Sequence, residues 1–401
     1  MTSAPMIPLS DPAFWQNPAE ILDEFRSKYR TAYADTGELC VLHWDDAEWT
    51  VKGTDFINQG IELLEKRGFC PGEPLHTWRS NALGIMNGAD HIRVRKLAAG
   101  ALSKRNIEPL RDMIKKRANR LMDQIDTSVP VDAMRSYAYV LPRVTMMEFL
   151  GLDAEELKGS EKPLSKARIA DCFGPGVNQE MRDNANQAIK QAMEHVGKLY
   201  QARREDPRDD LLTALLEAED KEGNLSHQEL ITLFSTIFGS GATTGGTISA
   251  GLMELSNQPE AAQLLRSDPD YWKQGASEEV LRMHPGIVEL PQKASHDFEA
   301  FDLNFKKGDT LSVRFHSTNR DPSRWNNPQK FDISRDPSTW SLSFGLGAHF
   351  CLGQAIARIT LEEALAAFVS RFNYIELAEP TRWTPFVMEN RLQGLKLKIK
   401  E

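Results

Sequence analysis

The spacing of apolar and polar positions divides the chain into a long helical part and a smaller part with strand character. An amphipathic pattern predicts a helix over residues 18–29, and two short alternating runs, 40–44 and 48–51, predict a small hairpin. Helical periodicity then dominates from about residue 88 to 293. Short strand-like segments follow, notably 310–315, and a last helix is predicted from about 351 to 372. The pattern predicts one compact domain over residues 1–401, mainly α with a small β region.

One predicted helix is unusually long and rich in glycine. Ser226 and Glu229 form a capping box, and apolar residues continue toward Asn257, which gives about 30 residues or roughly 45 Å. Each interior glycine costs up to ~1 kcal/mol relative to alanine. The glycines therefore indicate either close packing against another helix or a surface that faces a ligand and water, and both readings stay open. They flank Ala242, Thr243 and Thr244 and are Gly239, Gly241, Gly245 and Gly246.

Composition and charge restrict the class of protein. Hydrophobic residues make up 41% and charged residues 26%, as in soluble globular proteins, and the net charge is −9. An acidic balance argues against nucleic acid as a partner, because binding phosphates needs a basic face. No apolar run reaches about 18 residues, and the N-terminus lacks a signal pattern. These features predict a cytoplasmic protein that does not bind a membrane.

Two short motifs carry candidate chemistry. Glu279 and Arg282 lie three positions apart on a predicted helix and can pair, and taken alone they are most simply a surface ion pair. The four cysteines stand far apart, so neither a disulfide framework nor a zinc site is expected. Cys351 differs from the other three, because it follows a glycine-rich loop and precedes a predicted helix. A thiol near a helix N-terminus favours the thiolate, and a thiolate is the ligand that a haem iron needs for oxygen activation.

The segment 344–353, Phe-Gly-x-Gly-x-His-x-Cys-x-Gly, resembles the haem-binding signature of the cytochrome P450 family. Other family motifs follow in the right order between about residues 88 and 372. The resemblance implies a triangular, mainly α prism that binds one haem b (iron protoporphyrin IX), with Cys351 as the iron ligand. It also implies that Glu279 and Arg282 form a buried triad with Arg335. The remaining residues that the resemblance places at the haem are Phe344, Gly345, Gly353, and the propionate-binding His91, Arg95 and His349.

The chain departs from the family pattern at two points. The family has an acid directly before the central-helix threonine, whereas this chain has Ala242 before Thr243 and Thr244. We expect Thr243 to hold the oxygen and to pass protons through water, for which the neighbouring glycines would leave room. The second departure is Gln292-Lys293-Ala294, where the family often has an arginine that binds a propionate.

The resemblance implies a monomeric monooxygenase that inserts one oxygen atom into a small apolar substrate, by hydroxylation or oxidative dealkylation. Electrons would come from an acidic ferredoxin and its NAD(P)H reductase, because basic residues are concentrated between positions 91 and 120, Lys104, Arg105, Arg111 and Lys115 among them. Ala242 leaves two other enzymes open, a peroxygenase and an NADH-dependent nitric oxide reductase. A non-catalytic haem-binding protein is a third alternative. The residues expected to line the substrate pocket are Trp78, Phe173, Ile237, Gly241, Val288 and Phe386.

Overall fold

The computed structural model describes residues 5–102, 107–152, 169–173, 177–208, 210–220, 225–386 and 388–401. The chain forms two compact units, each assembled from separate stretches of sequence. The first unit comprises Met1–Ile57, Arg111–Leu141 and Thr243–Glu401, and the second comprises Asn58–Leu110 and Pro142–Ala242. That residues 1–401 act as one domain stays a prediction. Lys104 and Arg105 of the basic stretch lie outside the described residues, as does Val387 beside the pocket candidate Phe386.

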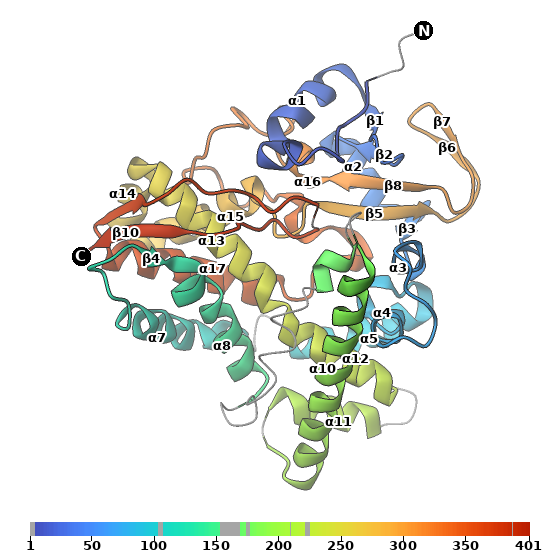
Figure 1. The fold of residues 1–401 in the computed structure, drawn as a ribbon, viewed down its shortest axis with the longest axis horizontal. Coiled ribbons are helices and arrows are strands. Elements are labelled where there is room, and N and C mark those ends of the chain that lie inside the picture. The colour runs from blue at the N-terminus through green and yellow to red at the C-terminus, as the bar shows by residue number, and fades with distance from the viewer. Residues whose placement is uncertain are drawn as a thin grey trace. The chain divides into compact units, whose positions relative to one another are not determined.

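A five-stranded sheet of order β1-β2-β8-β5-β3 organises part of the first unit (Figure 1). Its central pairing is parallel, with Leu39 of β2 opposite Leu311 of β8, and β5 then pairs antiparallel with β8. Two smaller sheets have the orders β4-β10-β9 and β6-β7. The strands are β1 (Thr31–Tyr33), β2 (Leu39–Val41), β3 (Phe56–Asn58), β4 (Val131–Asp132), β5 (Glu289–Ala294), β6 (Phe298–Ala300), β7 (Leu303–Phe305), β8 (Thr310–Arg314), β9 (Tyr374–Leu377) and β10 (Lys396–Lys400).

The five-stranded sheet separates two apolar clusters. Because side chains alternate along a strand, Leu39 and Val41 lie on one face of β2 and Cys40 on the other. Leu39 and Val41 pack in a buried cluster with Leu311 and Val313 of β8. Cys40 packs in a second cluster that includes Leu22. The predicted strand at 310–315 is confirmed as β8.

The predicted hairpin between 40–44 and 48–51 is wrong. The strand β2 instead pairs antiparallel with β1, which precedes it in the chain. Residues 48–51 lie in a helix, Trp44–Lys52, whose buried side chains include Trp44, Ala47 and Thr50. These three positions recur every third residue and so fall on one helical face, while Asp45 and Asp46 occupy the first turn, where carboxylates stabilise a helix.

The helices of the first unit surround a helix that is buried on most of its surface. This helix, α17, packs against α7 and α15. It begins at Gln354, so the predicted start near residue 351 is three residues too early. The helix predicted over 18–29 is confirmed as α1. The helices are α1 (Pro18–Lys28), α2 (Trp44–Lys52), α7 (Arg111–Met122), α13 (Gly241–Asn257), α14 (Pro259–Ser267), α15 (Pro269–Met283), α16 (Phe315–Thr318) and α17 (Gln354–Arg371), with short turns η1 (Phe14–Gln16), η4 (Met134–Ala138), η6 (Leu342–Phe344) and η7 (Gly347–His349).

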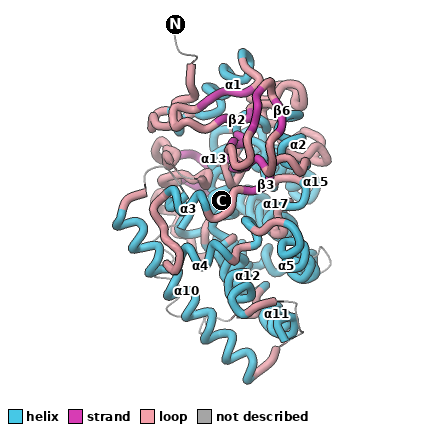
Figure 2. The backbone as a smooth tube through the Cα atoms, turned by 90° about the vertical axis from the view of Figure 1, so that its right-hand side faces the viewer, coloured by secondary structure: helices cyan, strands magenta, loops and turns pink. Residues whose placement is uncertain are grey.

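The second unit is built on α10 (Gln179–Glu205), the long helix labelled in Figure 2. It packs against α4 and α12, and its buried Ala185 and Ile189 share a cluster with Phe69 and Leu75. The other elements of this unit are α3 (Glu62–Lys66), α4 (Pro74–Ser80), α5 (Gly88–Ala101), α11 (Leu211–Asp220), α12 (His227–Gly239) and the turns η2 (Leu83–Ile85), η3 (Glu108–Leu110) and η5 (Ile169–Phe173). The helices α8 (Val140–Phe149) and α13 cross the boundary between the units, since Gly241 and Ala242 of α13 belong to the second unit.

The long glycine-containing helix is two helices, α12 and α13, with a turn at Ser240. The capping box of Ser226 and Glu229 is present, so the predicted start is confirmed and the predicted continuity is wrong. Ser240 donates its hydroxyl hydrogen to the carbonyl oxygen of Ile237, at 2.7 Å. A serine side chain bonded to the preceding turn competes with the helical backbone and favours such a break.

Most of the glycines in this segment allow close packing. A Cβ at Gly245 would lie 2.8 Å from the Tyr139 ring, and one at Gly246 would lie 3.1 Å from the carbonyl oxygen of Asn390. A Cβ at Gly241 would meet the backbone of Pro142 at 3.3 Å, whereas one at Gly239 would have nothing within 4 Å. The expectation that these glycines leave room for water is therefore wrong for Gly241, Gly245 and Gly246.

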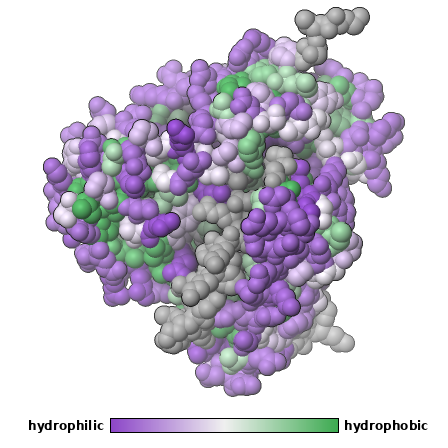
Figure 3. Space-filling model, in the orientation of Figure 1, coloured by the Kyte–Doolittle hydropathy of each residue, from purple (hydrophilic) through white to green (hydrophobic). Residues whose placement is uncertain are grey.

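The part of the chain that the structure describes contains no helix both long and apolar enough to cross a membrane. The face seen in Figure 3 is mostly hydrophilic, with apolar residues exposed in scattered patches.

Candidate active site

The cysteine loop presents the Cys351 side chain at the surface of the first unit. Cys351 is exposed and forms no disulfide. Its backbone N–H donates to the carbonyl oxygen of Phe344 at 2.9 Å, which closes the loop. Gly345 and Gly347 have φ angles of +67° and +66°, in the left-handed region that a side chain disfavours. The two glycines are therefore required by the loop conformation, and Gly353 stands directly before α17.

Neighbouring elements hold this loop on both sides. A Cβ at Gly347 would lie 2.9 Å from the carbonyl oxygen of Val51 in α2, so the loop packs closely on that helix. Asn319 accepts the N–H of Leu342 at 2.8 Å and donates to the Ser343 hydroxyl at 3.0 Å. Ser343 in turn donates to the carbonyl oxygen of Leu281 in α15. The start of the loop is thereby tied to α15.

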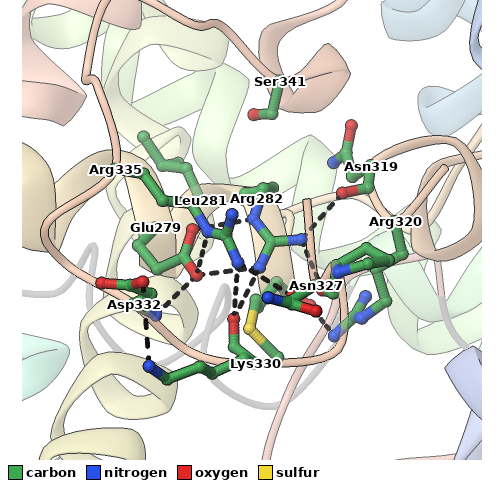
Figure 4. A network of polar contacts seen from close by, with 12 residues as sticks. Glu279, Leu281, Arg282, Asn319, Arg320, Asn327, Lys330, Asp332, Arg335 and Ser341 are labelled. Atoms are coloured by element: carbon green, nitrogen blue, oxygen red, sulfur yellow. Dashed lines mark hydrogen bonds and ion pairs between the residues drawn. The ribbon is translucent and has the colours of Figure 1, made fainter. Parts of the chain in front are cut away.

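The predicted triad of Glu279, Arg282 and Arg335 is present and buried at its centre. Arg282 donates from Nε to Glu279 Oε2 at 2.7 Å, and Arg335 donates from Nε to Glu279 Oε1 at 3.2 Å (Figure 4). Glu279 and Arg282 are 2% and 1% exposed, so the simple reading as a surface ion pair is wrong. Arg282 also donates to the carbonyl oxygen of Asn319 at 3.0 Å. The network therefore supports the residue that anchors the cysteine loop.

The propionate candidates lie in different units. His91 and Arg95 are on α5 in the second unit, one turn apart, and His91 is buried. Burial, and then the positive charge of Arg95, lowers the pKa of His91. His349 belongs to η7 of the cysteine loop and is half-buried. Arg93 on the same helix belongs to the basic stretch expected to bind a ferredoxin, and it pairs with Glu229 of the α12 capping box.

The pocket candidates of the second unit lie on four elements. Trp78 of α4 donates its indole N–H to the hydroxyl of Ser235 at 2.8 Å. Phe173 of η5 packs in the same cluster as Trp78, and the Arg79 guanidinium lies 4.9 Å from its ring centroid. Ile237 is buried in α12. Gly241, at the start of α13, is buried beside Pro142.

The first unit places Thr243 in a contact that sequence reasoning missed. Its hydroxyl donates to Glu389 Oε1 at 3.3 Å. Ala242 is exposed, and Thr244 is half-buried. No pattern along the chain links positions 243 and 389, which stand 146 residues apart, so no sequence signal could have found this carboxylate.

The other two pocket candidates also belong to the first unit. Val288 is buried, and its N–H donates to the carbonyl oxygen of Met388 at 3.0 Å. Phe386 has a φ of +61° and packs edge-on against Trp15, with ring centroids 6.1 Å apart. A backbone conformation that is rare for a bulky residue identifies Phe386 as a constrained position.

The cysteine loop fits a haem-thiolate ligand. A thiolate ligand must present its sulfur, and the Cys351 side chain is exposed while Cys40 and Cys172 are buried. Cys351 also stands three residues before α17, near the positive end of that helix, which favours the thiolate. Gly345 borders open space, since a Cβ there would have nothing within 4 Å, and a Cβ at Gly353 would lie 3.9 Å from Cys351 Sγ.

Solved structures resemble this chain over almost its whole length. A Bacillus subtilis cytochrome P450, PksS of the bacillaene polyketide synthase, has a TM-score of 0.87 and 26% identity, covering 99% of this chain and 100% of that one. An epothilone D-bound cytochrome P450, P450epoK, has a TM-score of 0.90 and 24% identity, with 99% and 100% coverage. These similarities confirm the predicted fold.

Sequence comparisons identify the family. The family model described as Cytochrome P450 matches residues 164–271 and 274–394. The polyketide biosynthesis cytochrome P450 PksS of Bacillus subtilis is 31% identical over 317 residues, which is 78% of this chain and 76% of that protein. The 6-deoxyerythronolide B hydroxylase of Saccharopolyspora erythraea is 29% identical over 332 residues, or 82% and 80% of the two chains. The chain therefore belongs to the cytochrome P450 family of monooxygenases.

Proposed function

We propose that this protein is a monomeric, cytoplasmic haem-thiolate monooxygenase that inserts one oxygen atom from O₂ into a small apolar substrate. The second oxygen atom leaves as water, which requires two electrons and two protons for each product molecule. An acidic ferredoxin with its NAD(P)H reductase supplies the electrons. The observation that carries the proposal is the exposed Cys351, presented by a loop of the family's signature sequence.

Family membership implies a haem-thiolate cofactor, and we assign its binding to the residues that match the family's motifs. When bound, haem b supplies the metal centre at which O₂ is activated. The Cys351 thiolate would bind the iron, and Phe344, Gly345 and Gly353 of the same loop would contact the haem. The residues that bind the propionates are His91, Arg95 and His349. Lys293 of β5 stands where the family often has an arginine, and it is a further candidate for this role.

The names of similar proteins narrow the substrate class. By name, PksS acts in polyketide biosynthesis and another relative hydroxylates 6-deoxyerythronolide B. Luteothin monooxygenase of Streptomyces thioluteus is 27% identical over 384 residues. We therefore place polyketide-derived molecules first among the apolar substrates to be screened. The side chains that would contact the substrate are mostly apolar or aromatic, as expected of a small-molecule site. They are Trp78, Phe173, Ile237, Gly241, Val288 and Phe386.

The test of iron ligation uses the carbon monoxide complex of the reduced protein. We expect the red-shifted Soret band of thiolate ligation in the parent and its loss in Cys351→Ser, because serine cannot supply a thiolate. Cys70→Ser is the matched control, since Cys70 is the other exposed cysteine and should leave the band unchanged. A histidine-type band in the folded parent protein would contradict the assignment.

The test of activity measures O₂, reductant, product and peroxide together, in a screen of apolar substrates that displace iron-bound water. Incorporation of one ¹⁸O atom from labelled O₂ into a product is the expected result. Reduction of nitric oxide by NADH without a ferredoxin would instead favour the nitric oxide reductase that Ala242 left open. Product formed only with added peroxide would favour a peroxygenase.

A further inference from the structure

We propose that Glu389 is the carboxylate that serves Thr243 in proton delivery and replaces the acid that the family has at position 242. The inference rests on the proposed monooxygenase function, and both Thr243 and Glu389 belong to the first unit. Glu389 acts through the Thr243 hydroxyl, so it is a positioning and proton-supplying residue.

The backbone brings Glu389 to Thr243. Residues after α15 pair with the C-terminal segment: the N–H of Asn390 donates to the carbonyl oxygen of Gly286 at 3.1 Å, and Ile287 stands opposite Glu389. Gly286 permits a close approach to α13, because a Cβ there would lie 2.5 Å from Thr243 Cγ2. Thr243 is therefore held with its methyl group against Gly286 and its hydroxyl 3.3 Å from Glu389 Oε1.

Glu389 also lines a small cavity. The cavity has a volume of about 80 Å³. A single water needs only about 10–15 Å³ of such space, so several waters fit. The inner wall includes Glu389, Asn390 and His316, and the outer wall is formed by the segment Trp15–Ala19, in which Gln16 and Asn17 are exposed. A chain of waters can therefore connect Glu389 with the solvent.

The cavity wall is polar and carries positive charge. Arg320 is 4% exposed, and burial lowers the pKa of its guanidinium to about 9, so it remains a cation at neutral pH. Burial, followed by the charge of Arg320, lowers the pKa of His316 well below its usual value, which makes His316 a neutral imidazole. His284 pairs with Glu254 at 2.7 Å and stacks on Trp383. Such a wall offers hydrogen-bond partners to water.

The proposed proton transfer involves Thr243, Glu389 and the cavity waters, and each proton that leaves is replaced from solvent. With Glu389 ionised, the Thr243 hydroxyl donates to it, as in the structure. When a proton from solvent reaches Glu389 through the cavity waters, the protonated carboxyl group can donate to the Thr243 oxygen, and the Thr243 hydroxyl can pass on its own proton. Glu389 returns to the carboxylate and is protonated again from the cavity. Each turnover uses this relay twice, and the redox partner supplies the two electrons.

The first test does not depend on turnover. A double-mutant cycle of Thr243→Val and Glu389→Ala measures whether the two side chains interact in the folded protein, from unfolding rates in denaturant. We expect the effect of the double variant to differ from the product of the single effects by roughly threefold to tenfold. Independent effects would mean that the contact does not exist in solution, and the proposal would be wrong.

The second test measures product formed per reducing equivalent. Glu389→Gln keeps the shape of the side chain but cannot carry a proton, so product formation should fall roughly 100-fold while peroxide increases. Thr243→Ala should divert reducing equivalents to peroxide in the same way. Haem loading and substrate affinity should stay at the parental values in both variants. Glu379→Gln, an exposed carboxyl of the same C-terminal segment, is the matched control.

The third test is rescue. Ala242→Asp places an acid directly before Thr243, at an exposed position that tolerates the larger side chain. In the Glu389→Gln background it should restore coupling, and Glu389→Asp should retain more coupling than Glu389→Gln. Parental coupling in Glu389→Gln would overturn the inference, as would a loss that neither aspartate restores. If the parent itself makes no product from O₂, the proposed function fails instead.

Discussion

The consecutive residues Asn319, Arg320 and Asp321 have three different structural roles. Asn319 anchors the cysteine loop, and Arg320 lines the cavity beside Glu389. Asp321 accepts the N–H of Trp44, the first residue of α2, at 2.8 Å. It thereby caps a helix whose own N-cap residue, His43, makes no side-chain capping bond. Since the cysteine loop packs on α2, Asn319 and Asp321 both contribute to the position of the loop.

Asp321 should make stability depend on pH. Burial alone would raise the pKa of Asp321, but hydrogen bonds from His43, Trp44 and Ser323 outweigh it and lower the pKa below its usual value. A carboxyl with a lowered folded pKa stabilises above its unfolded pKa of about 3.9, and this contribution is lost as the pH falls further. Urea midpoints of the parent should therefore fall more steeply below about pH 5 than those of Asp321→Asn. The exposed Asp112→Asn should follow the parent, and parallel curves for all three proteins would contradict the prediction.

At the scale of elements, the buried triad connects α15 to the segment 326–335 and to Asn319. Removing one partner leaves a buried charge without compensation. Glu279→Ala should therefore cost about 3–5 kcal/mol of unfolding free energy and give little haem-loaded protein. The control is Glu48→Ala, which breaks an exposed pair with Lys52 and should cost at most about 1 kcal/mol. Equal denaturation midpoints for the two variants would show that the triad contributes no more than a surface pair.

The glycines of α12 and α13 provide a second test at this scale. Gly245→Ala would force a methyl group to within 2.8 Å of the Tyr139 ring, and overpacking of this kind costs about 1–3 kcal/mol. Gly239→Ala meets no neighbour and should be neutral or stabilise the helix by up to about 1 kcal/mol. Chemical denaturation of both variants checks the prediction. If Gly239→Ala destabilises the protein and Gly245→Ala does not, the assignment of Gly245 as a packing position is wrong.

At the scale of the whole molecule, basic residues stand out against a net charge of −9. Some of these basic residues form ion pairs within the protein and are therefore weaker candidates for binding a partner. Arg111 pairs with Glu362 and Glu363 of α17, at 2.7 and 2.8 Å. Arg93 pairs with Glu229 and Asp90. Lys115, Lys116 and Arg120 on α7 remain exposed and are the better candidates for binding an acidic ferredoxin.

Lys115→Glu should slow reduction by an acidic ferredoxin, and the parent's rate should itself fall as ionic strength rises. The reason is that screening shortens to about 8 Å at physiological salt, which weakens electrostatic steering. Lys28→Glu on α1 makes the same change of charge and should have little effect. Stopped-flow reduction at several salt concentrations measures both variants. Rates that do not respond to salt or to Lys115→Glu would exclude this docking surface.

The sequence by itself determined the features that depend on local patterns. The cysteine loop needs glycine at two positions of positive φ, and the capping box and the helix over 18–29 follow from residues close in sequence. The Glu279–Arg282 spacing places both groups on one helical face. The motifs therefore identified the family, the thiolate candidate and the partners of the triad.

Tertiary structure decided what depends on contacts between distant residues. It made residues 48–51 a helix, because one face of α2 could be buried beneath the sheet. It broke the long helix at Ser240 and showed that Gly245 and Gly246 are packing positions. Above all, it placed Glu389 against Thr243 through the backbone pairing of Gly286 with Asn390. A carboxylate 146 residues away leaves no periodic signal, so only the folded chain shows which acid stands beside the threonine.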